Sequence, residues 1–256
     1  MIHPIKSYFK FLWNSKNEHG VHSPFVFDLV TQCFYDTKKY PEYSILKNYR
    51  NTLLANKNTI EVTDFGAGSK VFKSNTRAIY KIAKNAGIAS KRAELLFRLT
   101  QYFQPESILE IGTSLGLATA ALSLGNPKAK ITTLEGCRET AQIANKQFQQ
   151  FNFNVDCVVT EFRSYLQQPT TANCQLVYFD GNHQKQATLD YFEMVLPTLT
   201  NETVWIFDDI HWSNEMEEAW GIIKQHPKVT ATIDTFQWGF VFFRSEQEKE
   251  HFVIRI

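Results

Sequence analysis

The chain has 256 residues, 43% of them hydrophobic and 14% aromatic, and a net charge of +1 at pH 7. This size and composition suit one large domain, or one domain with an appendage, with a substantial apolar core. The near-neutral charge argues against a protein that binds nucleic acid through a broad phosphate-facing surface. No apolar run approaches the roughly 18 residues that span a bilayer, so we expect no stable membrane insertion. Four scattered cysteines predict reduced thiols in a cytoplasmic protein.

The first sixteen residues mix apolar side chains with lysines and carry no cleavable signal pattern. The apolar members are Ile5, Tyr8, Phe9, Phe11, Leu12 and Trp13. Their spacing predicts an amphipathic helix. Such a helix can pack on its own domain or on a partner subunit, or it can lie in a membrane interface, and the sequence leaves these alternatives open.

Residues 18–25 form a dense motif, Glu-His-Gly-Val-His-Ser-Pro-Phe. His19 and His22 are three residues apart, a spacing that metal ligands also use. No cysteine or further histidine nearby completes a site, and Pro24 interrupts a continuous helix. The alternatives to metal binding are a structural turn and a contact to a substrate or another subunit.

Residues 1–104 are predicted to be mainly helical, with breaks at 20–24 and 64–69. Within this region, residues 70–98 contain eight lysines or arginines and one glutamate. A solvated basic helix face explains this bias, and so does attraction of an anionic substrate.

From residue 105 to the C-terminus, predicted strands alternate with predicted helices. The strands are 107–111, 131–134, 155–159, 176–179, 204–207, 230–234 and 240–243, and the helices are 118–124, 138–151, 187–199 and 215–225. This alternation predicts a Rossmann-like α/β fold with a mostly parallel sheet. A turn at 237–239 predicts a closing antiparallel β-hairpin.

A glycine-bearing loop, Glu110 to Gly116, joins the first of these strands to its helix. Gly112 and Gly116 allow a ligand to approach the backbone, at the edge where open α/β sheets bind ligands. Glu135 ends the next strand, about 20 residues further on, where an acid can accept hydrogen bonds from ribose hydroxyls. A dinucleotide-binding oxidoreductase is the competing interpretation. Against it, the middle glycine of G-x-G-x-x-G is missing, and Glu110 would repel a pyrophosphate.

Carboxylates also follow the fourth and fifth predicted strands, with Asp180 after one and Asp208 and Asp209 after the other. Carboxylates that converge on one edge of a sheet suit a hard cation such as Mg²⁺, and His183 is close enough in sequence to handle a proton there. Each residue also has a structural interpretation: Asp180 as a loop contact, Asp208 as a cap and His183 as a helix-start residue.

The loop and its acid resemble the first motif, E/D-x-G-x-x-x-G, of the class I S-adenosylmethionine-dependent methyltransferases. The resemblance covers about residues 105–245 and implies a seven-stranded sheet, S-adenosylmethionine as the cofactor, and substrate binding or oligomerisation by residues 1–104. The implied cofactor-binding residues are Glu110, Gly112, Thr113, Ser114 and Gly116, of which Glu110, Gly112 and Thr113 face the methionine end, with Glu135 at the ribose and Glu161 and Phe162 beside the adenine. Asp180 is a further candidate, because it could contact the methionine amine.

A second loop at residues 64–69, Asp-Phe-Gly-Ala-Gly-Ser, follows a strand-like run and imitates this motif. No strand that ends in an acid comes after it. We therefore expect a structural turn or part of a substrate pocket there.

Counted from Asp180, a histidine stands at +3 (His183) and two aspartates stand at +28 and +29 (Asp208, Asp209). This spacing resembles the metal-dependent O-methyltransferases. The catechol type has a lysine at +3, whereas the macrolide-sugar type has a histidine in Asp-Gly-x-His, as this chain does. The resemblance implies the three aspartates as Mg²⁺ ligands and His183, with Asp180, as catalytic residues, His183 being the general base.

The sequence therefore predicts a cytoplasmic S-adenosylmethionine-dependent methyltransferase that methylates a hydroxyl of a small, anionic molecule with the help of Mg²⁺. A homodimer is a further expectation. The alternative is a methyltransferase-like domain that only binds or assembles. Methylation of nucleic-acid bases is disfavoured, because the strand before Asp180 does not lead into an Asn/Asp-Pro-Pro-aromatic motif.

Overall fold

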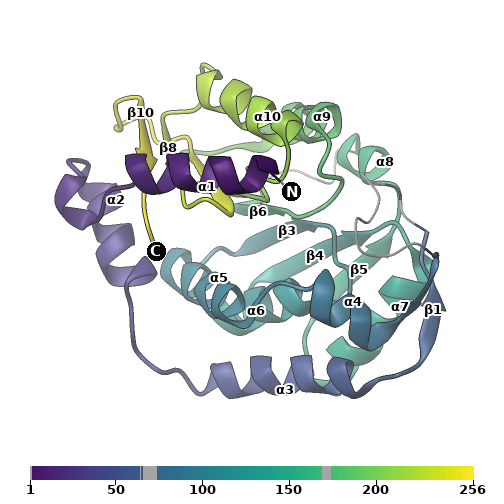
Figure 1. Ribbon diagram of the computed structural model, residues 1–256. Helices are drawn as coiled ribbons and strands as arrows, with labels where there is room; N and C mark the ends of the chain where they lie inside the picture. Colours follow the sequence, from purple (N-terminus) through teal and green to yellow (C-terminus); the bar gives the residue numbers. More distant parts are fainter. Residues whose placement is uncertain (1, 64, 66–73, 169–173) are drawn as a thin grey trace. The chain divides into compact units, whose positions relative to one another are not determined.

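The computed structural model describes residues 2–63, 65, 74–168 and 174–256, and Figure 1 shows its elements. The chain divides into two compact units: unit 1 contains residues 1–36 and 166–256, and unit 2 contains residues 37–165. Each unit carries strands that are mostly parallel and alternate with helices, which confirms the predicted fold class. The division at residue 104 was a prediction about the role of the N-terminal region, and it stays a prediction.

Unit 2 carries a three-stranded parallel part of the sheet, preceded by helices. Its first elements are α3 (Glu42–Ala55), β1 (Thr59–Glu61), β2 (Thr76–Ala78), α4 (Ile79–Asn85) and α5 (Ser90–Phe103). It continues with β3 (Ser107–Ile111), α6 (Leu117–Gly125), β4 (Lys130–Glu135), α7 (Arg138–Gln150), β5 (Val155–Val159) and α8 (Phe162–Leu166). Four of the five β3 residues are buried, whereas β5 has no fully buried residue and forms an edge.

Unit 1 carries a five-stranded mixed part, in the order β10-β8-β9-β7-β6. Its N-terminal elements are α1 (Ile2–Asn14), η1 (Glu18–Gly20), α2 (Pro24–Leu29) and η2 (Val30–Phe34). The remainder are β6 (Leu176–Phe179), α9 (Lys185–Val195), η4 (Leu196–Thr198), β7 (Val204–Asp208), α10 (Asn214–Gln225), β8 (Ala231–Asp234), β9 (Trp238–Phe242) and β10 (Glu250–Val253). Every residue of β6, β7, β8 and β9 is buried; β6, β7 and β9 are almost wholly apolar, whereas β8 also buries Thr232 and Asp234.

Local sequence signals explain the boundaries of several elements. Helix α10 begins after Ser213, whose hydroxyl accepts a hydrogen bond from the Met216 N–H, and acidic residues occupy its first turn. The final hairpin turns earlier than predicted, because Phe236 takes a left-handed conformation (φ +73°) and β9 already begins at Trp238.

The structure corrects the predicted number of strands. The closing hairpin is present, with β9 antiparallel to both β7 and β8. In addition, β10 pairs in parallel with β8, so unit 1 has one strand more than the sequence predicted. The region before residue 105 is mainly helical as predicted, apart from the short antiparallel pair β1–β2.

Two further features are the state of the cysteines and the length of the helices. The four cysteines are free thiols, and Cys33 and Cys137 are buried. Within the described ranges, no helix is long and apolar enough to cross a membrane.

Candidate functional site

The glycine-bearing loop of unit 2 is built from left-handed backbone conformations. Gly112, Ser114 and Gly116 have φ angles of 106°, 48° and 75°. Such angles are natural for glycine and strained for serine, so the turn between β3 and α6 depends on this sequence. The N–H groups of Gly112 and Thr113 both donate to the Leu134 carbonyl at 3.0 Å, which fixes the loop against β4.

Glu110 lies at the base of the loop and is completely buried. One carboxylate oxygen accepts hydrogen bonds of 2.5 Å from the hydroxyls of Thr119 and Thr133. Burial raises the pKa of Glu110 to about 7, although these two hydrogen bonds oppose the shift. The other oxygen, Oε1, has no hydrogen-bond partner in the described part of the chain. A buried acceptor without a donor favours a cationic or donor group from a ligand at this position.

Glu135, at the carboxyl end of β4, holds the loop from the other side. Its Oε2 accepts the Ser114 N–H at 2.8 Å, and its Oε1 accepts the Cys137 N–H at 2.9 Å. Charge-assisted hydrogen bonds of this length are among the stronger polar contacts in proteins. The carboxylate therefore fixes the conformation of Ser114 as well as marking the predicted ribose position.

The other predicted cofactor residues of unit 2 fall into two groups. Thr113 is buried, and its hydroxyl lies 2.6 Å from that of Thr133, so its side chain belongs to the network around Glu110. Glu161 and Phe162 follow β5, where Glu161 is exposed and accepts a hydrogen bond from the Ser164 hydroxyl. Phe162 begins α8.

Gly116 is required by packing within unit 2. A Cβ atom at this position would come within 2.5 Å of both Phe148 and the Tyr49 hydroxyl. Tyr49 is fully buried and donates a hydrogen bond of 2.9 Å to the Leu115 carbonyl. The sequence pattern pointed to ligand approach, but the close neighbours here are side chains from α3 and α7.

A cavity of about 500 Å³ lies beside this tyrosine, between α3, α5 and α6. Small-molecule sites usually fall in this size range. Its lining includes the cations Lys47 and Arg50, the acid Glu94 and the apolar Leu117. The Arg50 guanidinium donates to the carbonyls of Ala83 and Ile88, and burial lowers its pKa.

The Asp-Gly-Asn-His segment of unit 1 brings two predicted catalytic residues together. His183 Nε2 lies 3.7 Å from Asp180 Oδ1, and each side chain is 25% exposed. The neighbouring Asn182 is left-handed (φ 54°), and its side-chain Oδ1 is buried without a partner in the described residues. This pair combines a proton acceptor with an adjacent carboxylate that remains accessible to solvent.

Asp208 and Asp209 follow the next strand of unit 1. The register pairs Phe179 with Phe207, so Asp180 and Asp208 leave adjacent strands at the same edge, as the sequence predicts. Asp208 itself is buried, however. Its Oδ2 accepts the Tyr178 hydroxyl at 2.8 Å, and its Oδ1 accepts the Asp209 N–H at 2.7 Å.

The predicted metal ligands are therefore not gathered into a cluster. Among the residues that the structure describes, no group of three or more histidine, cysteine, aspartate or glutamate side chains could hold a metal ion. The two oxygens of Asp208 accept hydrogen bonds from Tyr178 and Asp209. Binding of Mg²⁺ stays a prediction.

The second glycine-bearing loop lies largely outside the described residues, which include only Phe65 of positions 64–69. The segment before it forms β1, whose partner β2 is antiparallel. At its end the Thr63 N–H donates to Cys137 Sγ, which in turn donates to the Glu61 carbonyl. The next strand in the described residues is β2, which is antiparallel to β1 and ends at Ala78.

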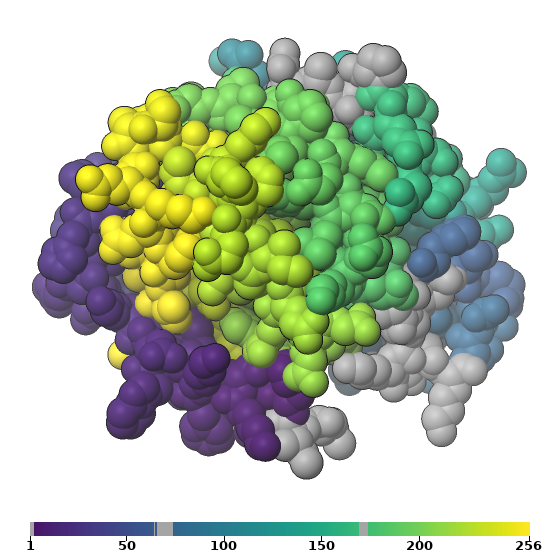
Figure 2. All heavy atoms as spheres, turned by 90° about the horizontal axis from the view of Figure 1, so that it is seen from above, coloured from purple at the N-terminus to yellow at the C-terminus, as the bar shows by residue number. Residues whose placement is uncertain are grey.

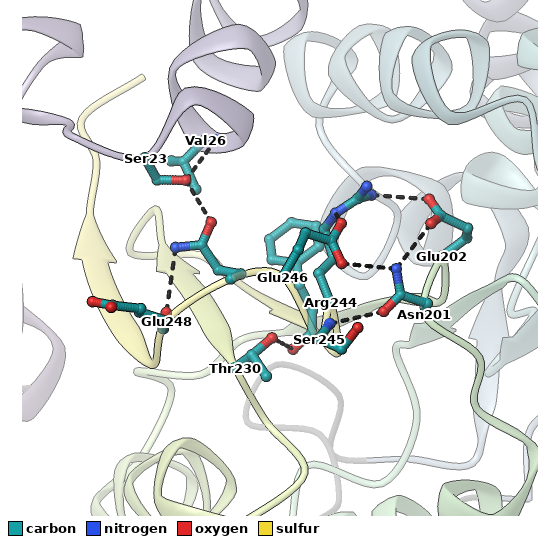
Figure 3. A network of polar contacts seen from close by, with 11 residues as sticks. Ser23, Val26, Asn201, Glu202, Thr230, Arg244, Ser245, Glu246 and Glu248 are labelled. Atoms are coloured by element: carbon teal, nitrogen blue, oxygen red, sulfur yellow. Dashed lines mark hydrogen bonds and ion pairs between the residues drawn. The ribbon is translucent and has the colours of Figure 1, made fainter.

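The motif at residues 18–25 contacts the segment after β9 within unit 1 (Figure 3). The Ser23 hydroxyl caps α2 by accepting from the Val26 N–H, and it donates to Gln247 at 2.7 Å. The Arg244 guanidinium lies 4.6 Å from the centre of the Phe25 ring and pairs with Glu202 and Glu246. His19 and His22 are not part of a metal cluster in the described residues. These contacts favour the structural interpretation.

Sequence reasoning missed the supporting residues Thr119, Thr133 and Tyr178. Each donates a hydroxyl to a buried carboxylate from a neighbouring element. A hydroxyl in the first turn of the helix after the loop was the available signal for Thr119, because a buried Glu110 needs donors. Nothing in the pattern around Tyr178 distinguishes it from an ordinary apolar strand residue.

Comparison with known proteins agrees with this architecture. Residues 109–210 match a family model described as a methyltransferase domain. Similar solved structures include an O-methyltransferase from Bacillus cereus in complex with SAH, with 19% identity, 81% of this chain and 92% of that chain covered, and a TM-score of 0.54. An SAH-bound methyltransferase from Podospora anserina has 12% identity, coverage of 88% and 97%, and a TM-score of 0.61.

A third similar structure is the O-methyltransferase TomG from Streptomyces achromogenes in complex with SAM, with 16% identity, coverage of 84% and 95%, and a TM-score of 0.54. At these identities the likeness establishes the fold. Residues 109–210, which contain the glycine-bearing loop and both carboxylate-bearing strand ends, match a methyltransferase domain model, and the chain shares the fold of these methyltransferase structures. The resemblance that the sequence motif indicated is confirmed.

Proposed function

We propose that this protein transfers a methyl group from S-adenosylmethionine to a hydroxyl of a small molecule. The observation that carries the proposal is the frame around the loop from Gly112 to Gly116, with Glu110 buried beneath it and Glu135 bonded to its backbone. This frame occurs within the segment that matches the methyltransferase family model.

The residues present suit S-adenosylmethionine, which supplies an electrophilic methyl group when bound. Glu110 offers a buried oxygen without a partner among the described residues, and the ammonium of a methionine moiety would give it a charged donor. Glu135 would accept from ribose hydroxyls, since a carboxylate that takes two backbone N–H groups retains further lone pairs. Ser114, Glu161 and Phe162 complete the proposed contacts.

His183 is the proposed general base. An attacking hydroxyl must lose its proton, and a histidine can accept one near neutral pH. The Asp180 carboxylate at 3.7 Å would stabilise the imidazolium that forms. Partial exposure of both side chains leaves room for an acceptor molecule to reach them.

Magnesium dependence is a separate part of the proposal. Asp180, Asp208 and Asp209 would hold the ion, and Asp208 would have to exchange the Tyr178 hydroxyl for it. Chelation with EDTA, followed by addition of Mg²⁺, distinguishes the two versions. Activity that falls and recovers supports the metal, whereas full activity in chelator assigns Asp208 a structural role.

The acceptor is proposed to be anionic. Cationic side chains on exposed parts of α4 and α5, Lys81, Lys84 and Lys91, support this, because a surface of one sign attracts the opposite charge. The N-terminal region is proposed to contribute to substrate binding or to a homodimer. Free thiols accord with the reducing cytoplasm as the proposed compartment.

The direct test is a search for a methylated product. The purified protein would be incubated with methyl-labelled S-adenosylmethionine and fractionated small-molecule extracts, and products would be identified by mass spectrometry. We expect a labelled product that requires His183 and is unaffected by His19→Ala, a change at a histidine whose side chain is 81% exposed. Cofactor binding without any methylated product would favour the binding-module alternative.

A further inference from the structure

Helix α1 exposes a continuous apolar stripe. Ile5, Phe9 and Trp13 are 58%, 67% and 90% exposed. They stand four residues apart, so they lie on one line along a helix about 20 Å long. Exposed apolar side chains are ordinary when scattered, but three large ones in a row on one helix indicate a surface that something covers.

The opposite side of α1 is held on unit 1. Tyr8 and Phe11 pack against Phe236, with ring centres 4.9 and 5.5 Å apart, and Phe11 is buried. Phe236 in turn stacks on His211, which lies between the carboxylates of Glu217 and Asp234 at 2.6 and 2.8 Å. One face of α1 therefore already packs on unit 1, and the exposed stripe is not part of that contact.

The main-chain contacts after α1 strengthen this attachment. The Lys16 N–H donates to the Val253 carbonyl, and the Lys16 carbonyl accepts the Arg255 N–H. With α1 attached in this way, its stripe points to solvent. Figure 2 shows the N-terminal residues, in purple, at the surface of the molecule.

The charges beside the stripe identify its partner. Lys6 and Lys10 are exposed and lie within about 100° of Phe9 around the helix, and α1 contains no aspartate or glutamate. We propose that α1 docks this protein on the surface of an anionic lipid bilayer. Aromatic rings would enter the headgroup boundary while the two lysines meet lipid phosphates, an arrangement typical of interfacial helices.

A second copy of the chain fits the same surface less well. Pairing two stripes would bring Lys6 and Lys10 of both copies together with no acidic residue on either helix. Like charges that meet at an interface are unfavourable, whereas an anionic bilayer neutralises them.

Vesicle binding tests the proposal. The full chain with a native amino terminus would be sedimented with vesicles of phosphatidylcholine alone or of phosphatidylcholine mixed with phosphatidylglycerol. We expect binding to the anionic vesicles, weakened by salt, with a blue-shifted fluorescence contribution from Trp13. Lys6→Gln with Lys10→Gln should weaken binding on the order of 30-fold, from about 1 kcal/mol per lysine.

The apolar stripe has its own variants and a matched control. Phe9→Ser with Trp13→Ser should weaken binding on the order of 100-fold, because two aromatic side chains no longer leave water. Phe27→Ser changes a 42% exposed phenylalanine on α2 and should bind as the wild type does. Thermal unfolding and cofactor affinity, measured for every variant, would show that each remains folded.

Two kinds of result would overturn the proposal. The first is that the protein does not bind vesicles, binds both kinds of vesicle equally, or binds as well when the stripe residues are changed. The other is a dimer in light scattering that Phe9→Ser with Trp13→Ser dissociates while vesicles are not bound, which would make the stripe a subunit interface.

Discussion

The carboxylates predicted to bind the cofactor and those predicted to act in catalysis differ in how they are held. In unit 2, Glu110 and Glu135 are fixed by hydroxyl and backbone donors around a strained loop. In unit 1, Asp208 is similarly engaged by Tyr178, but Asp180 and His183 form a loose pair at 3.7 Å with a quarter of each side chain exposed. The loop frame proposed for the cofactor is therefore preformed, whereas the groups proposed for proton transfer stay accessible to solvent.

The largest expected effect is on catalysis at the accessible pair. His183→Ala should lower the methylation rate on the order of 10²–10⁴-fold, the usual contribution of a positioned base. Affinity for S-adenosylmethionine should stay the same, since His183 is not part of the loop frame. Single-turnover rates with the identified acceptor provide the measurement. A rate equal to that of the wild type would remove His183 from the mechanism.

The buried carboxyl group of Glu110 should make the stability of the protein depend on pH. The pKa of Glu110 is raised to about 7 in the folded protein, compared with 4.5 as its ordinary value. Its contribution to folding is therefore present below pH 4.5 and is lost as the pH rises to about 7, by up to about 3 kcal/mol. Glu110→Gln has no such titration.

The check is urea unfolding of the wild type and Glu110→Gln at pH 5 and pH 7.5. The free energy of unfolding of the wild type should fall more than that of the variant between these conditions. If the free energies of unfolding of both proteins change in parallel with pH, Glu110 titrates normally. The contrast between the buried Glu110 and the accessible Asp180 and His183 would then weaken.

A smaller effect is expected on cofactor affinity. Glu135→Ala removes the acceptor of the Ser114 and Cys137 N–H groups together with the proposed ribose contact. We expect the dissociation constant of S-adenosylmethionine to rise roughly 10- to 100-fold, as two charge-assisted hydrogen bonds suggest. Glu139→Ala, in the first turn of α7, is the matched control. Equal affinities of both variants would contradict the proposed frame.

The smallest effect concerns the second glycine-bearing loop. Gly66→Ala and Gly68→Ala should leave cofactor affinity nearly unchanged, because the acid proposed for the ribose follows the other loop. Isothermal titration with S-adenosylmethionine checks this, with Gly112→Ala as the comparison. Loss of binding in the first two variants but not in Gly112→Ala would show that the wrong loop was chosen.

Sequence patterns predicted the sheet well because buried strands leave a strong local signal. The strands β3, β5 and β6 have the predicted bounds, although β5 contains Asp156 and has no fully buried residue. Strand β10 was missed because Glu250–Val253 contains a glutamate and a histidine at its exposed edge and lacks the apolar run of a central strand. Short elements such as β2 and α8 give too few residues for a period to show.

The site was harder to predict because its geometry depends on contacts between distant residues. The spacing of Asp180 and Asp208 correctly placed them on adjacent strand ends. It could not reveal that the Tyr178 hydroxyl, one residue before the end of β6, would engage Asp208. Likewise, the sequence indicates Glu110 but not that Thr119 and Thr133 leave one of its oxygens without a partner in the described residues.

Isothermal titration with S-adenosylmethionine tests the central claim most directly. The buried Glu110 and the loop held by Glu135 predict one site per chain with micromolar affinity, roughly −8 kcal/mol. Binding should persist in EDTA, because the frame lies among residues that need no metal. Preferential binding of NAD, or no binding of S-adenosylmethionine by the folded protein, would contradict the account.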